Sequence, residues 1–220
     1  IQLFGNDSIG TIYASEMRHF TIDYDPLQIF TPENVTYTEP MEGYYPATYG
    51  FEEDEIGIVP DGWIDYSEPG CSIYTETEKN GHKNVLRLDD GNSNKNYARN
   101  SFSNQSYGTL EMWVLMQDAT WAVGIRLSET TSSSFLLRLF TYEDKWQYSD
   151  GIEPQIISAF DGSYDPQDNT WYHIKIHFRC DGAPSYQGLN ESKFRIVIDD
   201  LESEDLSLET DIKHINLLSF

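Results

Sequence analysis

Strict alternation of residue character, with a period of two, is the dominant pattern along the chain. The clearest case is the segment Thr170–Cys180, in which every second residue belongs to one largely apolar set: Tyr172, Ile174, Ile176, Phe178 and Cys180. A period of two places successive side chains on opposite faces of a β-strand. The segment therefore predicts a strand with one buried face.

The same kind of pattern recurs at several other places. Strands are predicted for Asn84–Asp90, Tyr107–Gln117, Trp121–Ser128, Ser134–Tyr142, Asp144–Gly151, Lys193–Asp200 and the closing run 211–220. A short polar loop joins Trp121–Ser128 to Ser134–Tyr142, so these two are expected to be antiparallel neighbours. No segment has a helical period of useful length. The pattern indicates an all-β fold, a two-sheet antiparallel jelly-roll sandwich spanning residues 47–220.

The first 46 residues follow a different plan. Residues 1–24 predict two strands separated by a turn at Gly5–Ser8. Pro26, Pro32, Pro40 and Pro46 then exclude a regular helix or central strand, and residues 25–46 are expected to form an extended linker. The sequence opens and closes inside strand-like patterns, so we expect it to be a piece of a longer protein.

Charge restricts the partners. The 220 residues include 37 acidic and 14 basic ones, which gives a formal net charge of −23. A field of that sign repels phosphate backbones and anionic membrane surfaces, so nucleic acids are not expected as partners. No apolar run approaches the roughly 20 residues that span a bilayer, so this segment is not expected to insert into a membrane.

The densest acidic run, Glu52–Glu55, directly follows Phe51. Its simplest interpretation is a solvated face. A structural calcium ion bound through Glu52 or Asp54 is the second, because Ca²⁺ takes several carboxylate and carbonyl oxygens at once. Further calcium ligands are expected among turn carboxylates, namely Asp89, Asp90, Asp199 and Asp200.

Cysteine usage and sequons bear on the location of the protein. Cys71 and Cys180 are the only cysteines, and they allow one disulfide or two buried thiols. We predict the disulfide. Four sequons are candidate glycosylation sites, at Asn6, Asn34, Asn104 and Asn190. Both features favour an extracellular or cell-surface location.

Two segments resemble known modules. Asn6–Gly10 and Phe20–Asp23, within "GNDSIGTIYASEMRHFTIDYDP", are similar to the last strands of an immunoglobulin-like module of prokaryotic surface proteins. The segments "YGFEEDEIGIVPDGW", "YGTLEMWVLM" and "NTWYHIKIHFRCD" resemble the concanavalin A-like lectin/glucanase sandwich in its laminin-G-like form. Long archaeal surface proteins are the kin that these resemblances suggest. They imply that Phe51 packs inward, that Pro60–Gly62 turns, and that Trp63 plugs the sandwich edge.

The resemblance implies fold more than function, because this sandwich carries both enzymes and binding modules. Glycosidases of this fold place two carboxylates on one strand face, whereas Tyr107–Gln117 offers only Glu111. His173 and His177 share a strand face but lie about 13 Å apart in an extended chain, too far for one metal ion. We therefore expect no enzymatic activity.

Ligand binding remains as the leading hypothesis. Sugar sites combine aromatic surfaces with hydrogen-bonding side chains, and the central strands offer such a set. The candidate ligand-binding residues are Trp113, Arg126, Arg138, Trp146 and Tyr148. The predicted function is a non-catalytic extracellular module that binds a glycan or a surface protein. The alternatives are a self-assembling subunit of a surface layer or filament, and a polysaccharide-active enzyme.

Overall fold

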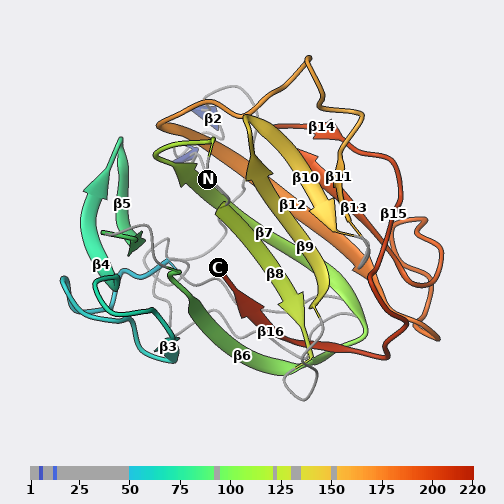
Figure 1. Ribbon diagram of the computed structural model, residues 1–220, viewed down its shortest axis with the longest axis horizontal. Coiled ribbons are helices and arrows are strands. Elements are labelled where there is room, and N and C mark those ends of the chain that lie inside the picture. Colours follow the sequence, from blue (N-terminus) through green and yellow to red (C-terminus); the bar gives the residue numbers. More distant parts are fainter. Residues whose placement is uncertain are drawn as a thin grey trace. The chain divides into compact units, whose positions relative to one another are not determined.

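The computed structural model describes residues 5–6, 12–13, 50–91, 95–120, 123–129, 135–149 and 153–220. Every regular element among them is a β-strand, as Figure 1 shows, and the predicted all-β class is confirmed. Within these ranges there is accordingly no helix with the length and apolar character to span a membrane.

The chain divides into two compact units, Ile1–Pro40 and Met41–Phe220. In the first, β1 (Gly5–Asn6) pairs antiparallel with β2 (Ile12–Tyr13), with Gly5 opposite Tyr13. The strand predicted after residue 16 and the linker predicted at 25–46 lie outside the described residues. The resemblance of residues 1–24 to an immunoglobulin-like module and the linker at residues 25–46 stay predictions.

The second unit is built on two main antiparallel sheets. The seven-stranded sheet has the order β11 (Pro154–Ile156), β10 (Lys145–Ser149), β9 (Phe135–Tyr142), β8 (Val123–Ser128), β16 (Ile215–Ser219), β6 (Ala98–Gln105) and β3 (Trp63–Asp65). The five-stranded sheet consists of β14 (Leu201–Glu202), β13 (Lys193–Ile198), β12 (Thr170–Arg179) and β7 (Tyr107–Met116), with β15 (Leu206–Ser207) also paired to β13. The expected pairing of β8 with β9 is confirmed.

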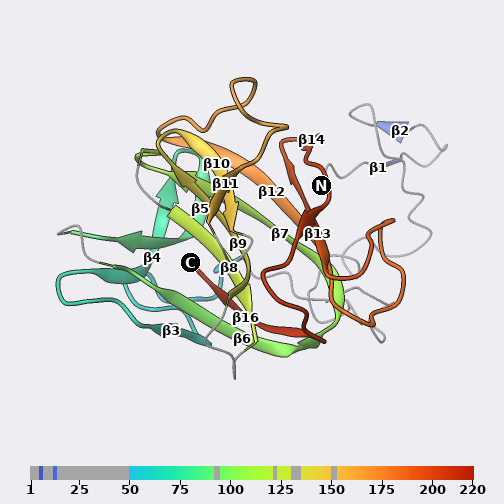
Figure 2. The same cartoon turned by 45° about the vertical axis from the view of Figure 1, so that its right-hand side comes forward.

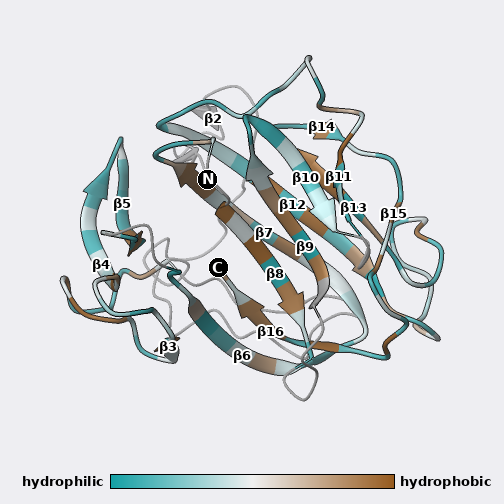
Figure 3. Ribbon diagram, viewed as in Figure 1, coloured by the Kyte–Doolittle hydropathy of each residue, from teal (hydrophilic) through white to brown (hydrophobic). Residues whose placement is uncertain are grey.

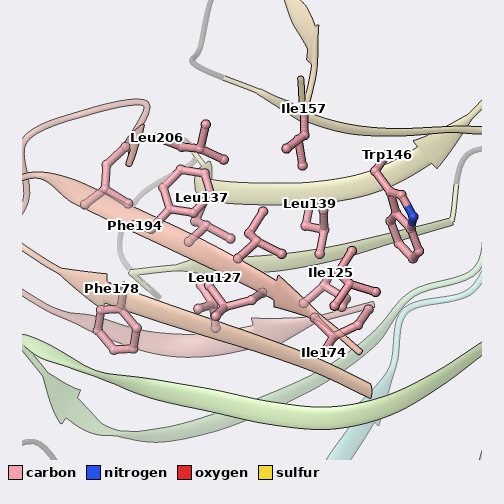
Figure 4. Packing of buried hydrophobic residues seen from close by; sticks show 14 of the residues in the cluster. Ile125, Leu127, Leu137, Leu139, Trp146, Ile157, Ile174, Phe178, Phe194 and Leu206 are labelled. Carbon is pink, nitrogen blue, oxygen red and sulfur yellow. The ribbon is translucent and has the colours of Figure 1, made fainter. Parts of the chain in front are cut away.

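The core lies between the two sheets, and the alternating pattern explains it. On β12, Ile174 and Ile176 are almost fully buried, whereas the polar residues between them point away. Figure 3 shows hydrophobic and hydrophilic positions alternating along the sandwich strands. Figure 4 shows the inward side chains of both sheets meeting, among them Leu127 and Leu139 from one sheet and Phe194 from the other.

The turn that leads into β3 folds as predicted. The backbone NH of Trp63 donates to the carbonyl of Pro60 at 3.1 Å, and Gly62 takes a φ of +78° in this turn. The Trp63 ring stacks on Phe220 at 5.6 Å and lies 6.1 Å from the half-buried Phe51 ring. Trp63 therefore closes one edge of the sandwich.

A separate hairpin, β4 (Ser72–Lys79) and β5 (His82–Asp89), stands beside the two sheets (Figures 1 and 2). The His82 ring at its tip lies 4.2 Å from the ring of Trp171 and 5.2 Å from that of Trp113. The indole NH of Trp171 donates to the carbonyl of Lys79 at 3.1 Å. The tip of the hairpin is thereby fastened to β12 and β7.

Candidate functional site

Three arginines form a row across the seven-stranded sheet, on the face that points away from the core. Arg138 of β9 lies opposite Arg126 of β8, Arg126 lies opposite Ser219 of β16, and Ser219 lies opposite Arg99 of β6. Directly opposite residues in a sheet project from the same face. Since Leu127 and the other neighbours of these arginines on β8 and β9 enter the core, the arginines project outward. We call these residues, with Ser219 between Arg126 and Arg99, the arginine row.

Each guanidinium of the arginine row lies over an aromatic ring. The Cζ atom of Arg138 is 4.4 Å from the centre of the Phe140 ring, and that of Arg99 is 4.4 Å from the centre of the Tyr66 ring. The Cζ atom of Arg126 is 5.2 Å from the centre of the Tyr97 ring. Such cation–π contacts contribute about 0.5–2 kcal/mol each. They hold the guanidinium planes in fixed places on the sheet.

The electrostatics of the row are unfavourable to its own charges. Burial lowers the pKa of Arg138, and the neighbouring Arg126 charge lowers it further, while Glu209 and Tyr97 act in the opposite sense. The buried Nε atoms of Arg138 and Arg99 find no hydrogen-bond acceptor in the part of the chain that the structure describes. The unsatisfied Nε donors of Arg138 and Arg99, and the partly buried charge of Arg138, are therefore energetically unfavourable in the structure.

Two residues predicted to share this face lie on the opposite one. Trp146 is only 3% exposed and packs edge-to-face on Tyr172 at 5.2 Å, and Tyr148 packs on Phe194 at 6.0 Å. The register explains the difference, because Ser149 is the β10 residue opposite Arg138, and Trp146 and Tyr148 alternate with it. Figure 4 shows Trp146 within the core. The prediction that Trp146 and Tyr148 join Arg126 and Arg138 on a ligand face is therefore wrong.

Trp113 lies on the other sheet. It is 52% exposed on β7, and its ring stacks on His173 at 4.7 Å. Nearby, Glu111 accepts a hydrogen bond at 2.8 Å from His173 in the tautomer that carries the proton on Nε2, and it pairs with Lys175 at 3.5 Å. Glu111 is thus held between two side chains of β12. Because Trp113 lies on the five-stranded sheet, it does not contribute to the arginine row.

The acidic run fits a solvated loop. Glu52 is exposed, whereas Asp54 is half-buried and its Oδ1 accepts a hydrogen bond from the backbone NH of Asp61 at 2.8 Å. Among the described residues, no three His, Cys, Asp or Glu side chains gather closely enough to hold a metal ion. A calcium ion at Glu52 or Asp54 would need carbonyl oxygens or water as further ligands, and its presence stays a prediction.

The sequons lie in different settings. Asn104 is exposed on β6 and its Oδ1 accepts a hydrogen bond from Asn216 at 3.0 Å, and Asn190 is exposed in the segment before β13. Asn6 lies in β1, and Asn34 falls outside the described residues. Glycosylation at these positions stays a prediction.

The two cysteines are free thiols. Cys180 is fully buried among core residues at the end of β12, whereas Cys71 lies in a turn before β4, with its NH bonded to the carbonyl of Glu68 at 3.1 Å. The predicted disulfide is therefore wrong in this structure, because one sulfur is inside the core and the other is at the base of the hairpin. Burial raises the pKa of Cys180 to about 12.

Burial and the carboxylates of Asp90 and Glu68 also raise the pKa of Cys71, so it is the difference in burial that predicts unequal reactivity of the two thiols. At pH 7.5 a maleimide should label Cys71 in the folded protein and leave Cys180 unlabelled, because a buried thiol yields almost no thiolate. Both should react in guanidinium chloride, and a Cys71→Ser variant should lose the labelling of the folded state. An intact mass that is lower by two hydrogens without reductant would contradict the free thiols.

A shallow polar pocket opens near the start of β12, lined by Gly162, Ser163, Tyr164, Asp165, Gln167, Thr170 and Tyr172. Tyr164 donates to Asp199 Oδ2 at 2.5 Å, and burial together with this carboxylate raises the pKa of Tyr164 to about 12. Lys145 pairs with Asp165 at 2.8 Å. These groups bind one another and tie the loop to neighbouring strands, which indicates a structural role.

Sequence reasoning missed half of the arginine row. It found Arg126 and Arg138, but not Arg99, Ser219 or the rings of Tyr66 and Tyr97. The segment Ala98–Gln105 is polar almost throughout and does not show a clear apolar face. In the row, only Arg138 and Phe140, two positions apart, form a cation–π contact that was visible in the sequence, because Tyr66 and Tyr97 contact arginines at distant positions.

Comparisons with known proteins support the fold. No family model matches the chain, and no curated protein matches it. A solved structure of a sialidase is similar over 72% of this chain, with 11% identity and a TM-score of 0.57. A carbohydrate esterase from a Shiga toxin-encoding bacteriophage aligns over 71% of this chain and 81% of its own, with 14% identity and a TM-score of 0.43.

The coverage and the sequence identity decide what these similarities show. The chain spans 13% of the sialidase chain, and an identity of 11% shows a shared fold alone. The chain is thus an all-β sandwich like a part of a sialidase structure.

Proposed function

We propose that the sandwich is a non-catalytic glycan-binding module of an extracellular or cell-surface protein, with the arginine row at the centre of its binding face. The observation that carries the proposal is the register of Arg138, Arg126 and Arg99, with tyrosine rings beside two of them. Sugar sites combine aromatic surfaces with fixed hydrogen-bond donors, and each guanidinium provides five donors. The fold shared with part of a sialidase fits a carbohydrate ligand.

Binding without cleavage is favoured by the groups in the row. Cleavage of a glycosidic bond commonly needs two carboxyl groups on either side of one sugar. The row contributes guanidinium and hydroxyl groups instead, and Glu111 lies on the other sheet with His173 and Lys175 as partners. The location, self-assembly and structural calcium remain predictions beside this proposal.

A panel of neutral and acidic polysaccharides, tested for binding and for new reducing ends or unsaturated products, checks the proposal. We expect at least one polymer to bind without turnover. A Tyr66→Ala variant should weaken binding about tenfold, because the contact of a sugar with an aromatic ring is lost. Tyr66 is 51% exposed, so this change should not unfold the protein.

Trp113→Ala is the matched control, because Trp113 is 52% exposed on the other sheet. Its binding should equal that of the unchanged protein. If Trp113→Ala alone weakens binding, the binding face is on the five-stranded sheet. Turnover of any polymer would contradict the non-catalytic role.

A further inference from the structure

The cross-strand pair of Arg126 and Arg138 points to the chemical class of the glycan. We propose that the ligand is an acidic glycan and that these two arginines bind one carboxylate or sulfate group between them. The inference rests on the proposed function and adds the charge of the ligand to it.

The cost of placing the two guanidinium groups side by side is the first argument. Neighbouring strands are about 4.8 Å apart, and like charges directly opposite each other destabilise a sheet. Arg126 and Arg138 occupy such opposite positions, and Arg138 is also half-buried. An anion that bridges the two groups lowers their repulsion, whereas the hydroxyl of a neutral sugar does not. The pair is thus better suited to an acidic ligand than to a neutral one.

The donor geometry is the second argument. The guanidinium fork matches the two oxygens of a carboxylate or sulfate through parallel hydrogen bonds. The Nε atom of Arg138, one of the donors of such a fork, is buried and has no acceptor among the described residues. Because this atom is buried, an acidic group would satisfy it only after the Arg138 side chain shifts toward the ligand.

The third argument is the repeat along the row. Arg99 lies two strands from Arg126, with the buried Ser219 between them, at about twice the strand spacing, or roughly 10 Å. Its Nε atom is also buried and has no acceptor among the described residues. A glycan that runs across the strands therefore meets a second arginine, which favours a polymer with repeated acidic groups.

The net charge of −23 does not by itself oppose an acidic glycan at the arginine row. At 0.15 M salt the field of distant carboxylates is screened within about 8 Å, so contacts inside the row dominate. The rings of Tyr66 and Tyr97 beside the row add apolar surface suited to sugars.

Four polymers test the proposal by calorimetry at 0.15 M NaCl: polygalacturonate, its carboxyl-reduced form, dextran sulfate and dextran. We expect at least one acidic polymer to bind tenfold or more tightly than its neutral counterpart. Preference for polygalacturonate identifies carboxylate as the recognised group, and preference for dextran sulfate identifies sulfate.

Variants of the row locate the interaction. Arg126→Met and Arg138→Met should each weaken binding of the acidic polymer about ten- to hundredfold, the range for a lost charged hydrogen bond. Arg138→Lys should recover only part of the affinity, because an ammonium group keeps the charge without the fork. Thermal melts of the variants check that they are folded. If Arg138→Met fails to fold, Arg138→Lys and Arg126→Met decide the outcome.

Arg87→Met is the matched control. Arg87 is also a strand arginine with its Cζ over a ring, 5.8 Å from the centre of Tyr74, but it lies on the β4–β5 hairpin. Loss of the Arg87 guanidinium should leave binding of the acidic polymer unchanged. Equal binding of acidic and neutral polymers would overturn the acidic ligand and leave the proposed function in place. If none of the polymers in the panel binds, the proposed function is overturned as well. If Arg87→Met and Arg138→Met weaken binding of the acidic polymer equally, the arginine row is not the binding site.

Discussion

Replacing Ile176 with aspartate should leave the sandwich largely unfolded at 25 °C. Ile176 is 0% exposed in the middle of β12, opposite Ile196 of β13 and Leu110 of β7. A carboxylate at this point would be surrounded by apolar side chains, at a cost of several kcal/mol. Loss of the isoleucine side chain adds about 2–5 kcal/mol. Together these costs approach the whole stability of a typical domain, about 5–15 kcal/mol.

The adjacent residue supplies the control. Lys175 projects from the other face of β12 and pairs with Glu111 at 3.5 Å. Lys175→Gln should therefore change the free energy of unfolding by no more than about 1 kcal/mol, as expected for an exposed ion pair. Far-ultraviolet circular dichroism and urea titration measure both variants. A cooperative urea transition for Ile176→Asp close to that of the unchanged protein would contradict the assigned inward face.

The second large effect is expected at Trp146. Trp146→Ala should lower the free energy of unfolding by about 3–5 kcal/mol, the range for truncating a buried aromatic side chain. The ring fills the core against Tyr172 at 5.2 Å. Its Nε1 atom is buried and has no acceptor among the described residues. Trp146→Phe should therefore cost clearly less, because it keeps an aromatic ring and removes the unsatisfied donor.

Trp113 again provides the comparison. Trp113→Ala removes a ring that is 52% exposed and stacked on His173, so we expect a loss of about 1 kcal/mol. Urea midpoints of the three tryptophan variants, measured at one protein concentration, give the ranking. If Trp113→Ala and Trp146→Ala destabilise equally, the structure has assigned the wrong tryptophan to the core.

Local pattern was sufficient to predict most of the strands. The alternation in Thr170–Cys180 and Lys193–Asp200 predicted β12 and β13 with the correct inward faces, because each strand is buried on one side. The turn at Pro60–Gly62 followed from residue types that favour turns. These features depend on residues close together in sequence.

Features that depend on distant residues were not predictable in the same way. Trp146 and Arg138 lie on neighbouring strands, yet only the register shows that they occupy opposite faces. Arg99 entered the arginine row because β16 pairs with both β6 and β8. The free cysteines likewise follow from tertiary positions that two isolated residues in a sequence do not reveal.

The place of β16 has a consequence for the order of events during synthesis. Residues Ile215–Ser219 lie between β8 and β6, so the strands on either side are made about 90 residues or more before the one that joins them. A nascent chain cannot complete the seven-stranded sheet until this segment has left the ribosome. Until then β6 and β8 each present an unpaired edge, which is a template for wrong pairing with other chains. The long delay before β16 emerges should therefore expose this protein to aggregation during production, and holding chaperones should raise its yield.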